Sequence, residues 1–459
     1  MKRFDCHTHT HKSNYQHRDS TNFEGKLIDK AIELGLKGIA ITDHAVLSAH
    51  VDAILHLKKL REKGIGTDFK LGLGTEIYLV DRNVIAEARE KNEPTKFYHL
   101  VLVAKNYEGY RALAELSSNA WEQSFYFRGV ERIPTYKDYF VEWARRNKGN
   151  IIVTSACLGS EFSQMVLEFA QEQTDANRMK IDSFLRTMWE LFGEDFYIEI
   201  QPSHFEEQIV YNKLAMQIAN AYGIKVVIDT DAHYDSLEMK EIHSIYLKSQ
   251  NAERETEQFY ASAYLMGTEE LRTYFDYIND SQFNEYMNNS LEIADKIEEF
   301  DLFRETEVPS TTIQFDAARQ SILAPMVLST TKYPYIVKYG TSPEVIDRTL
   351  LQQIEEGLID KKVELTEVVL SRLNVELEAL WEVSEGLHQR MASYYLLTKE
   401  IVELMWKVSL VGVSRGSAGS FYICYLLGIT QINPLEYELD YWRHIDKNKI
   451  ELARQYWSV

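Results

Sequence analysis

Nine side chains with metal-binding donor groups are scattered over the first half of the chain, nearly all of them where an apolar, strand-like run gives way to a loop. This pattern limits the possible folds more than any other feature. They carry imidazole, carboxylate or thiolate groups, and they are His7, His9, Asp19, His44, Glu76, His99, Cys157, Asp231 and His233. In a barrel of parallel strands the carboxyl ends of the strands meet on one face, so donors distant in sequence become neighbours. The pattern therefore predicts an α/β barrel with a metal site at its mouth.

The local sequence supports this interpretation at most of these positions. The opening segment is a short strand candidate that ends in His7 and His9, and the two-residue period of a strand points both imidazoles to the same side. A helical pattern then leads into the β-branched run 38–42, which is followed by His44. Comparable runs precede Glu76, Cys157 and Asp231, so strand and helix patterns alternate and several units end in a donor.

The chemistry of the donors indicates which ions they would hold. Imidazole and carboxylate groups suit zinc, manganese or iron, and a thiolate at Cys157 favours zinc there. One four-coordinate ion would leave half of the donors unused, whereas ions about 3.5–4 Å apart can share carboxylates and hold both reacting oxygens of a phosphoester. We therefore expect two or three divalent ions (Zn²⁺, Mn²⁺ or Fe²⁺) and hydrolysis by a metal-bound hydroxide.

Each donor taken alone has a simpler explanation. His99 lies in an apolar run and resembles a core histidine, Cys157 resembles a small buried apolar residue, and Asp231 with His233 resembles a polar loop. The joint occurrence of all of them after strands favours the metal site. Asp43 and Asp229 are expected to orient neighbouring imidazoles without binding an ion themselves.

Several of these segments resemble a known family. Residues 5–10, 41–44, 74–76, 97–106, 155–159 and 231–234 are similar to the polymerase-and-histidinol-phosphatase (PHP) domain that opens the alpha subunit of bacterial DNA polymerase III, a C-family polymerase. The stretch His-Leu-Val-Leu-Val-Ala-Lys-Asn at 99–106 is closer to the polymerase branch than to the small phosphatases. The resemblance implies a PHP-type distorted (β/α)7 barrel that binds up to three metal ions.

The resemblance also implies functional residues. The nine donors match the metal ligands of the family, and the residues that it implies for catalysis are His7, His9, Glu76, Asp231 and His233. The acidic ligand of the first motif is assigned to Asp19, with His17 as the alternative, because the loop is longer here than usual. Family members with complete ligands act as 3′–5′ exonucleases or phosphoesterases, and some members that lost ligands keep the barrel as a scaffold.

The resemblance continues beyond the barrel. Residues 372–377 and 393–397 are similar to the helical lead-in to the polymerase palm, and 413–420 to its Gly-Ser phosphate loop, which implies a partial nucleotidyltransferase-like palm. Arg415, Gly416 and Ser417 would bind phosphate there, because a small turn that opens a helix lets N–H groups and a hydroxyl approach it. The Gly-Pro-Gly that usually precedes this arginine is replaced by Val-Gly-Val-Ser at 411–414.

The catalytic carboxylates of the family palm are missing from this sequence. No Asp-x-Asp follows Pro434, and nucleotidyl transfer by two Mg²⁺ ions needs at least two convergent carboxylates. We therefore expect the front part of a split polymerase, with the rest of the palm and the fingers on a second chain and Mg²⁺ in the completed palm. Apolar residues of the partial palm would face that partner: Phe421, Tyr422, Ile423, Tyr425 and Leu426. The alternative is a degenerate palm remnant.

Composition narrows the class of protein. The 459 residues, 45% of them apolar, allow two or three domains with cores, which we place at 1–300 (barrel), 301–341 (linker) and 342–459 (helical lead-in and truncated palm). No signal peptide or membrane-spanning run is recognisable, and three cysteines in unrelated segments indicate the reducing cytoplasm of a bacterial or phage-infected cell. A net charge of −20 argues against binding of long stretches of nucleic acid by this chain alone, but it is compatible with binding of a single-strand end.

The sequence thus predicts a protein of DNA replication whose barrel is a metal-dependent phosphoesterase, of the 3′–5′ exonuclease type. Its expected partners are the second polymerase chain, a DNA 3′ end and other replisome subunits. Two alternatives remain open: an inactive scaffold for replisome assembly, and a phosphatase or pyrophosphatase for small molecules. An aromatic and basic strip could stack terminal bases beside the site or could simply pack: Trp121, Phe125, Tyr126, Phe127 and Arg128.

Overall fold

A computed structural model describes residues 2–15, 18–249, 260–304, 307–328 and 331–446. The chain divides into two compact units, Met1–Leu302 and Phe303–Val459. Each unit has its own hydrophobic core, so the two are described separately. No helix within the described ranges is apolar over a length that would cross a lipid bilayer.

The first unit contains a sheet that closes almost completely into a barrel. Its eight strands follow the order β1-β2-β3-β4-β8-β9-β10, with β7 paired to β3. The strands of this path are β1 (Phe4–Thr8), β2 (Gly38–Ile41), β3 (Lys70–Val80), β4 (Tyr98–Ala104), β8 (Ile151–Thr154), β9 (Phe196–Ile200) and β10 (Val226–Ile228). Just after β10, Ala232 forms a parallel bridge with Thr8 of β1. The predicted α/β barrel is therefore confirmed.

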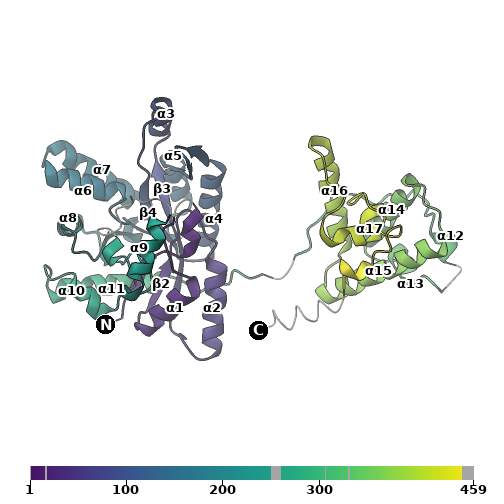
Figure 1. The fold of residues 1–459 in the computed structure, drawn as a ribbon, viewed down its shortest axis with the longest axis horizontal. Helices are drawn as coiled ribbons and strands as arrows, with labels where there is room; N and C mark the ends of the chain where they lie inside the picture. Colours follow the sequence, from purple (N-terminus) through teal and green to yellow (C-terminus); the bar gives the residue numbers. More distant parts are fainter. Residues whose placement is uncertain (1, 16–17, 250–259, 305–306, 329–330, 447–459) are drawn as a thin grey trace. The chain divides into compact units, whose positions relative to one another are not determined.

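Helices surround this sheet, as Figure 1 shows. Those of the first unit are α1 (Glu24–Glu33), α2 (His50–Glu62), α3 (Arg82–Lys91), α4 (Tyr107–Glu122), α5 (Lys137–Arg146), α6 (Glu161–Gln171), α7 (Asp175–Phe192), α8 (Glu206–Tyr222), α9 (Lys240–Lys248), α10 (Thr268–Thr273) and α11 (Asp280–Lys296). A hairpin of β5 (Phe125–Phe127) and β6 (Val130–Arg132) leads into β7 (Thr135–Tyr136). Local signals define several ends: the Ser160 hydroxyl caps α6, and Gly223, with φ +67°, ends α8.

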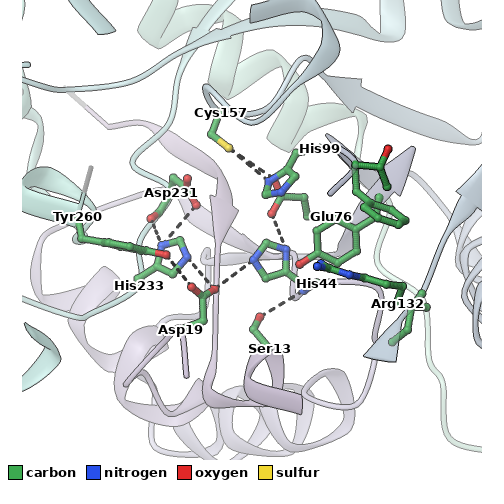
Figure 2. Close-up of a pocket in the computed structure, with 14 residues that line it drawn as sticks. Ser13, Asp19, His44, Glu76, His99, Arg132, Cys157, Asp231, His233 and Tyr260 are labelled. Carbon is green, nitrogen blue, oxygen red and sulfur yellow. Dashed lines mark hydrogen bonds and ion pairs between the residues drawn. The ribbon is translucent and has the colours of Figure 1, made fainter. Parts of the chain in front are cut away.

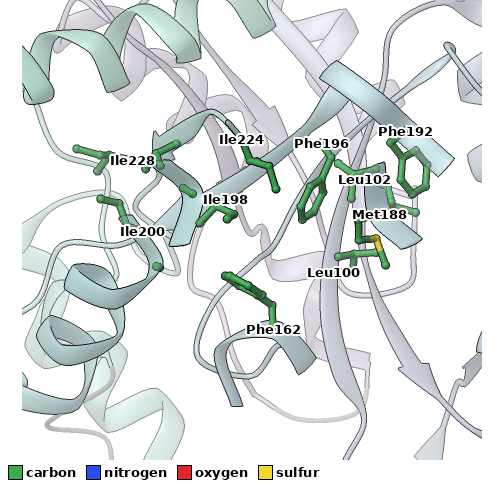
Figure 3. Close-up of a cluster of buried hydrophobic side chains, with 14 of the residues drawn as sticks. Leu100, Leu102, Phe162, Met188, Phe192, Phe196, Ile198, Ile200, Ile224 and Ile228 are labelled. Atoms are coloured by element: carbon green, nitrogen blue, oxygen red, sulfur yellow. The ribbon is translucent and has the colours of Figure 1, made fainter. Parts of the chain in front are cut away.

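The main core lies between the strands and the helices that cover them (Figure 3). Alternate residues of β4, such as Leu100 and Leu102, pack with Phe162 of α6 and Phe196 of β9 in this core. Residues of the opposite parity, such as Val101 and Val103, belong to a separate buried cluster with Phe4 of β1. The strands are buried on both faces, which explains their nearly continuous apolar sequence.

One strand of the barrel runs against the others. Strand β4 is antiparallel to both β3 and β8, whereas β1, β2 and β3 are parallel to one another and β8 is parallel to β9. The start of β4 therefore lies at the end of the barrel where the parallel strands finish. This corrects the expectation of an all-parallel barrel, and it explains why His99, the second residue of β4, joins donors that follow other strands.

All regular elements of the second unit within its described residues are helical. Its helices are α12 (Ala324–Val327), α13 (Pro334–Gly340), α14 (Val345–Asp360), α15 (Glu367–Leu387), α16 (Ala392–Val408) and α17 (Tyr422–Leu426), with single 3₁₀ turns at Gly416–Ser420 and Tyr441–Arg443. The buried carboxylate of Glu376 in α15 accepts hydrogen bonds from the backbone N–H groups of Tyr422 and Ile423, at 2.8 and 2.9 Å. This contact attaches the first turn of α17 to α15.

Two expectations about the second unit need correction. The range 301–341 is not only a linker, because it contains α12 and α13, and Val327, Ile336 and Tyr339 are buried in the core of the unit. The apolar residues of α17 do not face a missing partner, because most of them are buried under other helices: Phe421, Tyr422, Ile423 and Leu426 are at most 3% exposed, and Tyr425 packs against the same core.

Candidate metal centre

The barrel brings all nine predicted donor residues to one end of the sheet. His7 lies in β1, and His9 directly follows this strand. Glu76 lies within β3, and the pairing of β3 with β4 extends on both sides of this residue. The remaining donors come from loops after strands, except His99 near the start of β4. Figure 2 shows the side chains of His44, Glu76 and His99 turned toward one another at the cavity.

The carboxylate of Glu76 lies at the centre of the group. Its oxygens are 2.8 Å from Nδ1 of His44, 2.8 Å from Nδ1 of His99 and 3.3 Å from Nε2 of His9. Nε2 of His7 is 3.5 Å away. A buried carboxylate with nitrogens on several sides has the arrangement of a bridging ligand between adjacent cations.

Asp231 completes the side of the site nearest β1. Its Oδ1 atom lies 3.2 Å from Nε2 of His7 and 3.2 Å from Nε2 of His9. This oxygen is buried and makes no hydrogen bond within the described residues. Buried acceptors normally form hydrogen bonds. An acceptor that forms none, and that lies close to two imidazole nitrogens, is suited to binding a cation.

Asp19 joins two imidazoles on the other side. Its Oδ2 atom is 3.1 Å from Nε2 of His44 and 3.0 Å from Nε2 of His233, and Oδ1 accepts a hydrogen bond from the Tyr260 hydroxyl at 2.8 Å. The geometry thus puts Asp19 among the donors, whereas the alternative, His17, lies outside the described residues.

Cys157 lies at the edge of the group, beside His99. Its Sγ atom is 3.4 Å from Nδ1 of His99 and 3.9 Å from Oε1 of Glu76. Burial, together with nearby carboxylates, raises the pKa of this thiol well above its ordinary value. Gly159 allows the loop to approach, because a Cβ atom there would lie 3.1 Å from the His99 ring.

The donor atoms fall into three overlapping groups that fit divalent cations. The atoms within each group lie within 4.8 Å of one another, and the groups are His9–His44–His233, His7–His9–Glu76 and His44–Glu76–His99. His9, His44 and Glu76 each belong to two groups, so neighbouring positions would share ligands. The mixture of imidazole and carboxylate donors suits zinc, manganese or iron.

The charges of these groups are strongly coupled. Burial lowers the pKa of His44, but Glu76 and Asp19 outweigh it and raise this pKa to about 10. Burial raises the pKa of Glu76, but His99, His44 and His7 outweigh it and hold this pKa well below its ordinary value. Without a cation, protonated imidazoles therefore balance the buried carboxylates.

Residues outside the donor set fix the orientation of the imidazoles. Oε1 of Glu199 lies 2.8 Å from Nδ1 of His7. The Ser13 hydroxyl lies 3.2 Å from Nδ1 of His9 and donates to Asp43 at 2.7 Å. The sequence reasoning missed Glu199, Ser13 and Tyr260, although a glutamate inside the apolar run 196–200 was a usable signal for Glu199.

The expected roles of two aspartates have different outcomes. Asp43 acts on His9 through Ser13, in line with the expectation of indirect orientation. The expectation for Asp229 is wrong, because its Oδ1 accepts a hydrogen bond from the backbone N–H of Cys6, at 2.6 Å, below the donors. Burial, together with the nearby Glu199 and Asp5 carboxylates, raises the pKa of Asp229 well above its ordinary value.

Seven of the nine donors line a cavity of about 240 Å³: Asp19, His44, Glu76, His99, Cys157, Asp231 and His233. Tyr78, Phe97, Arg132 and Ile133 also line it. The Tyr78 ring stacks on the His44 ring, with centroids 5.2 Å apart. None of the residues of the aromatic and basic strip lines this cavity: Trp121, Phe125, Tyr126, Phe127 and Arg128.

The predicted phosphate loop of the second unit is exposed. Arg415, Gly416 and Ser417 lie on the surface at a 3₁₀ turn, and the Ser417 hydroxyl is 3.1 Å from Nδ1 of His444. The following helix, α17, has only five residues, so the loop does not open a long helix as expected. Phosphate binding by these three residues stays a prediction.

Comparisons with known proteins agree with both parts of this description. Residues 5–203 match the model of the PHP domain, and residues 345–453 match that of the bacterial DNA polymerase III alpha NTPase domain. The chain is 39% identical, over 97% of its length, to a DNA-directed DNA polymerase of Bacillus phage SPbeta. It is 26% identical, over 97% of its length, to the DNA polymerase III subunit alpha of Borreliella burgdorferi.

The matched part is about a third of each relative, because the alignments cover 36% of the phage protein and 34% of the Borreliella protein. A solved structure of a candidate metal-dependent phosphoesterase from Bifidobacterium adolescentis is similar to half of the chain. It covers 50% of this chain and 88% of its own, with 17% identity and a TM-score of 0.31.

Proposed function

Because the chain belongs to the DNA polymerase III alpha-like polymerases and carries their PHP domain, we propose that its barrel is a metal-dependent phosphoesterase that removes nucleotides from a DNA 3′ end. The observation that carries this proposal is the complete set of donors around the buried carboxylate of Glu76. A protein that kept the barrel only as a scaffold would not need to keep so many buried, mutually close imidazoles and carboxylates, because burying charged groups costs free energy even when they are paired.

In the proposed reaction, all nine donors hold two or three divalent ions of zinc, manganese or iron. Such cations would lower the pKa of a water molecule and neutralise the charge of the phosphodiester. His7, His9, Glu76, Asp231 and His233 would be the ligands closest to the reaction, as predicted for catalysis. Glu199 accepts the Nδ1 proton of His7 and thereby leaves Nε2 free as a ligand atom, as second partners of ligating histidines commonly do.

DNA synthesis by this part of the sequence would need groups that residues 1–459 do not contain. We propose that further polymerase sequence, on a second chain as predicted, supplies the palm carboxylates and binds Mg²⁺. The similarity to about a third of much longer polymerases supports the part of this proposal that further polymerase sequence takes part. DNA and other replisome subunits would then be partners of the assembled polymerase, and its place of action would be the cytoplasm.

The exonuclease proposal is tested with the purified chain, Mn²⁺ or Zn²⁺ and single-stranded DNA that carries a label at its 3′ end. We expect stepwise release of nucleotides that chelation abolishes. A double variant, His9→Ala with Asp231→Ala, serves as the blank, since both residues line the same cation position. Release at the level of this blank would reject the exonuclease proposal. Turnover of phosphomonoesters or pyrophosphate without loss of DNA would favour the small-molecule phosphatase.

A further inference from the structure

The cavity at the metal donors contains a single strong cation among its described lining residues. Of the described residues that line the cavity, Arg132 is the one lysine or arginine, whereas Asp19, Glu76 and Asp231 supply three carboxylates. Arg132 ends β6, is half-buried and pairs with Phe125 across the β5–β6 hairpin. Its guanidinium lies over the Phe97 ring, 5.4 Å from the centroid.

Apart from the Phe97 ring, this guanidinium has no hydrogen-bond or ion-pair partner within the described residues. Nε of Arg132 is buried and makes no hydrogen bond within the described ranges. Burial lowers the pKa of Arg132, as expected where a cation loses water without gaining a carboxylate. The three carboxylates of the same cavity form ion pairs with imidazoles and not with Arg132. A half-buried guanidinium of this kind is a ready partner for an anionic ligand.

The surroundings of Arg132 indicate what that ligand is. Figure 2 shows the side chain reaching the cavity beside His44, from the side of the cavity that carries the aromatic rings. The rings of Tyr78 and Phe97 line the same cavity and offer flat apolar surfaces for a base or a sugar. A cavity of about 240 Å³ is small, so it holds one terminal unit of a strand and not a duplex.

We propose that Arg132 binds the phosphate next to the one that is hydrolysed and thereby restricts the site to nucleotides joined by phosphodiesters. This inference rests on the proposed phosphoesterase function and names its substrate class, a single-strand end. Planar guanidinium groups bind two phosphate oxygens at once, so Arg132 also fixes the register of the strand. The hydrolysed phosphate lies against the donors.

Two substrates separate this role from a role in the reaction itself. A single-stranded oligonucleotide has a neighbouring phosphate, whereas bis(p-nitrophenyl) phosphate has only the phosphate that is hydrolysed. For Arg132→Met, we expect the KM for the oligonucleotide to rise about 10- to 100-fold, the effect of one lost charged hydrogen-bond pair. Turnover of bis(p-nitrophenyl) phosphate should change less than about twofold, which is small beside that effect.

Arg128 provides a matched control in the same hairpin. It lies in the turn between β5 and β6, does not line the cavity, and donates to the backbone oxygen of Asn92 at 2.6 Å. Arg128→Met should therefore leave both substrates unaffected. Arg132→Lys keeps the charge but loses the planar pair of donors, so its KM should be intermediate.

Binding provides a second readout that does not depend on cleavage. We would measure fluorescence anisotropy of an oligonucleotide with phosphorothioate linkages at its 3′ end, in Mn²⁺, over a range of salt concentrations. One lost phosphate contact should reduce the slope of log K against log salt by about 0.7 in Arg132→Met, and Arg128→Met should keep the full slope.

The outcomes distinguish this inference from the function on which it rests. If the wild type cleaves nothing but the slope changes as expected, the exonuclease proposal fails, and Arg132 is shown to contact a phosphate of the strand but not to select a substrate for hydrolysis. Equal losses on both substrates would overturn the inference, because Arg132 would then act on the hydrolysed phosphate. It would also be overturned by an unchanged KM for the oligonucleotide, by an unchanged slope, or by a wild type that does not bind the strand.

Discussion

Oε1 of Glu199 lies 2.8 Å from Nδ1 of His7, and both side chains are fully buried in the barrel. The residues are 192 positions apart in the sequence, and the glutamate comes from β9 while the histidine comes from β1. The Gln201 amide donates to the same oxygen at 2.7 Å, and the Thr154 hydroxyl donates to the other oxygen at 2.5 Å. Glu199 is thus held in place to orient one imidazole of the candidate metal centre.

Replacement of Glu199 by glutamine should weaken metal binding without changing the fold. The amide keeps the shape of the side chain but makes His7 a poorer donor, and such changes beside a ligand typically cost about 10- to 100-fold in metal affinity. Mass spectrometry of metal content and hydrolysis of bis(p-nitrophenyl) phosphate would measure the effect. Glu168→Gln, at an exposed ion pair with Lys180, is the control. Full metal content in Glu199→Gln at limiting metal would contradict the prediction.

Asp19→Asn should remove one of the bound ions. The neutral amide cannot bridge His44 and His233 as the carboxylate does, so the shared cation position loses its negative ligand. We expect a lower metal stoichiometry and a loss of hydrolysis, while His17→Ala keeps both. The opposite result, with loss only in His17→Ala, would assign the first-motif ligand to the alternative residue.

Metal should stabilise the protein more strongly as the pH rises. The pKa of His44 is about 10 in the metal-free protein, so an ion must displace a proton from this imidazole at neutral pH. In the metal-free state, the raised pKa means that His44 contributes stability fully below pH about 6.5 and loses it as the pH rises through about 10. Protons therefore compete less with the ion at higher pH.

Thermal unfolding with EDTA or Mn²⁺ between pH 6.5 and 9 would measure this trend. A ligand at 100 times its Kd adds about 2.7 kcal/mol to the free energy of unfolding, and the effective Kd should fall as the pH rises. His44→Gln should flatten the dependence on pH. A gain in Tm from Mn²⁺ that is constant over this range would contradict the coupling to protons.

The sequence predicted the candidate site better than its surroundings. Donors such as His7 and Asp231 could be recognised because side-chain type and strand position together predict where they meet. The antiparallel direction of β4 could not be predicted, since an apolar run carries no information on strand direction. Glu199 was missed because its role depends on a contact between strands far apart in sequence. Arg132 was missed because the prediction for this segment rested on its aromatic residues, which do not line the cavity.

The pair of Arg372 and Glu376 should control the stability of the second unit. Nε of Arg372 donates to Glu376 at 2.6 Å, and its Nη2 donates to the backbone oxygens of Ser420 and Leu439. Glu376→Ala would leave a mostly buried guanidinium and two N–H groups of α17 unpaired, which should cost about 3–5 kcal/mol. Hydrogen exchange of 416–426 would report the loss. Glu378→Ala, two residues along α15, should leave this exchange unchanged.

The same pair predicts a dependence on pH. Burial, which Arg372 offsets only in part, raises the pKa of Glu376 to about 7 from its ordinary value of 4.5. Between these values the folded state keeps a proton that the unfolded state releases, so the free energy of unfolding should fall as the pH rises, by up to about 3 kcal/mol. The contribution is fully present below about pH 4.5 and is lost above about pH 7. Glu376→Gln should lack this slope, and an unchanged slope would assign it to other groups.

The C-terminal half of α16 should cause self-association of the isolated chain. Leu404 is 61% exposed, Val408 is 79% exposed and Leu410, just after the helix, is 92% exposed. Together they form a solvent-exposed apolar surface. Leu404→Glu with Val408→Glu should reduce association in sedimentation velocity and change the free energy of unfolding by less than about 0.5 kcal/mol. Val368→Glu, at a single exposed valine of α15, should leave association unchanged. If the double variant associates like the wild type, these residues do not cause the association. If it unfolds more easily, they contribute to the core of the second unit.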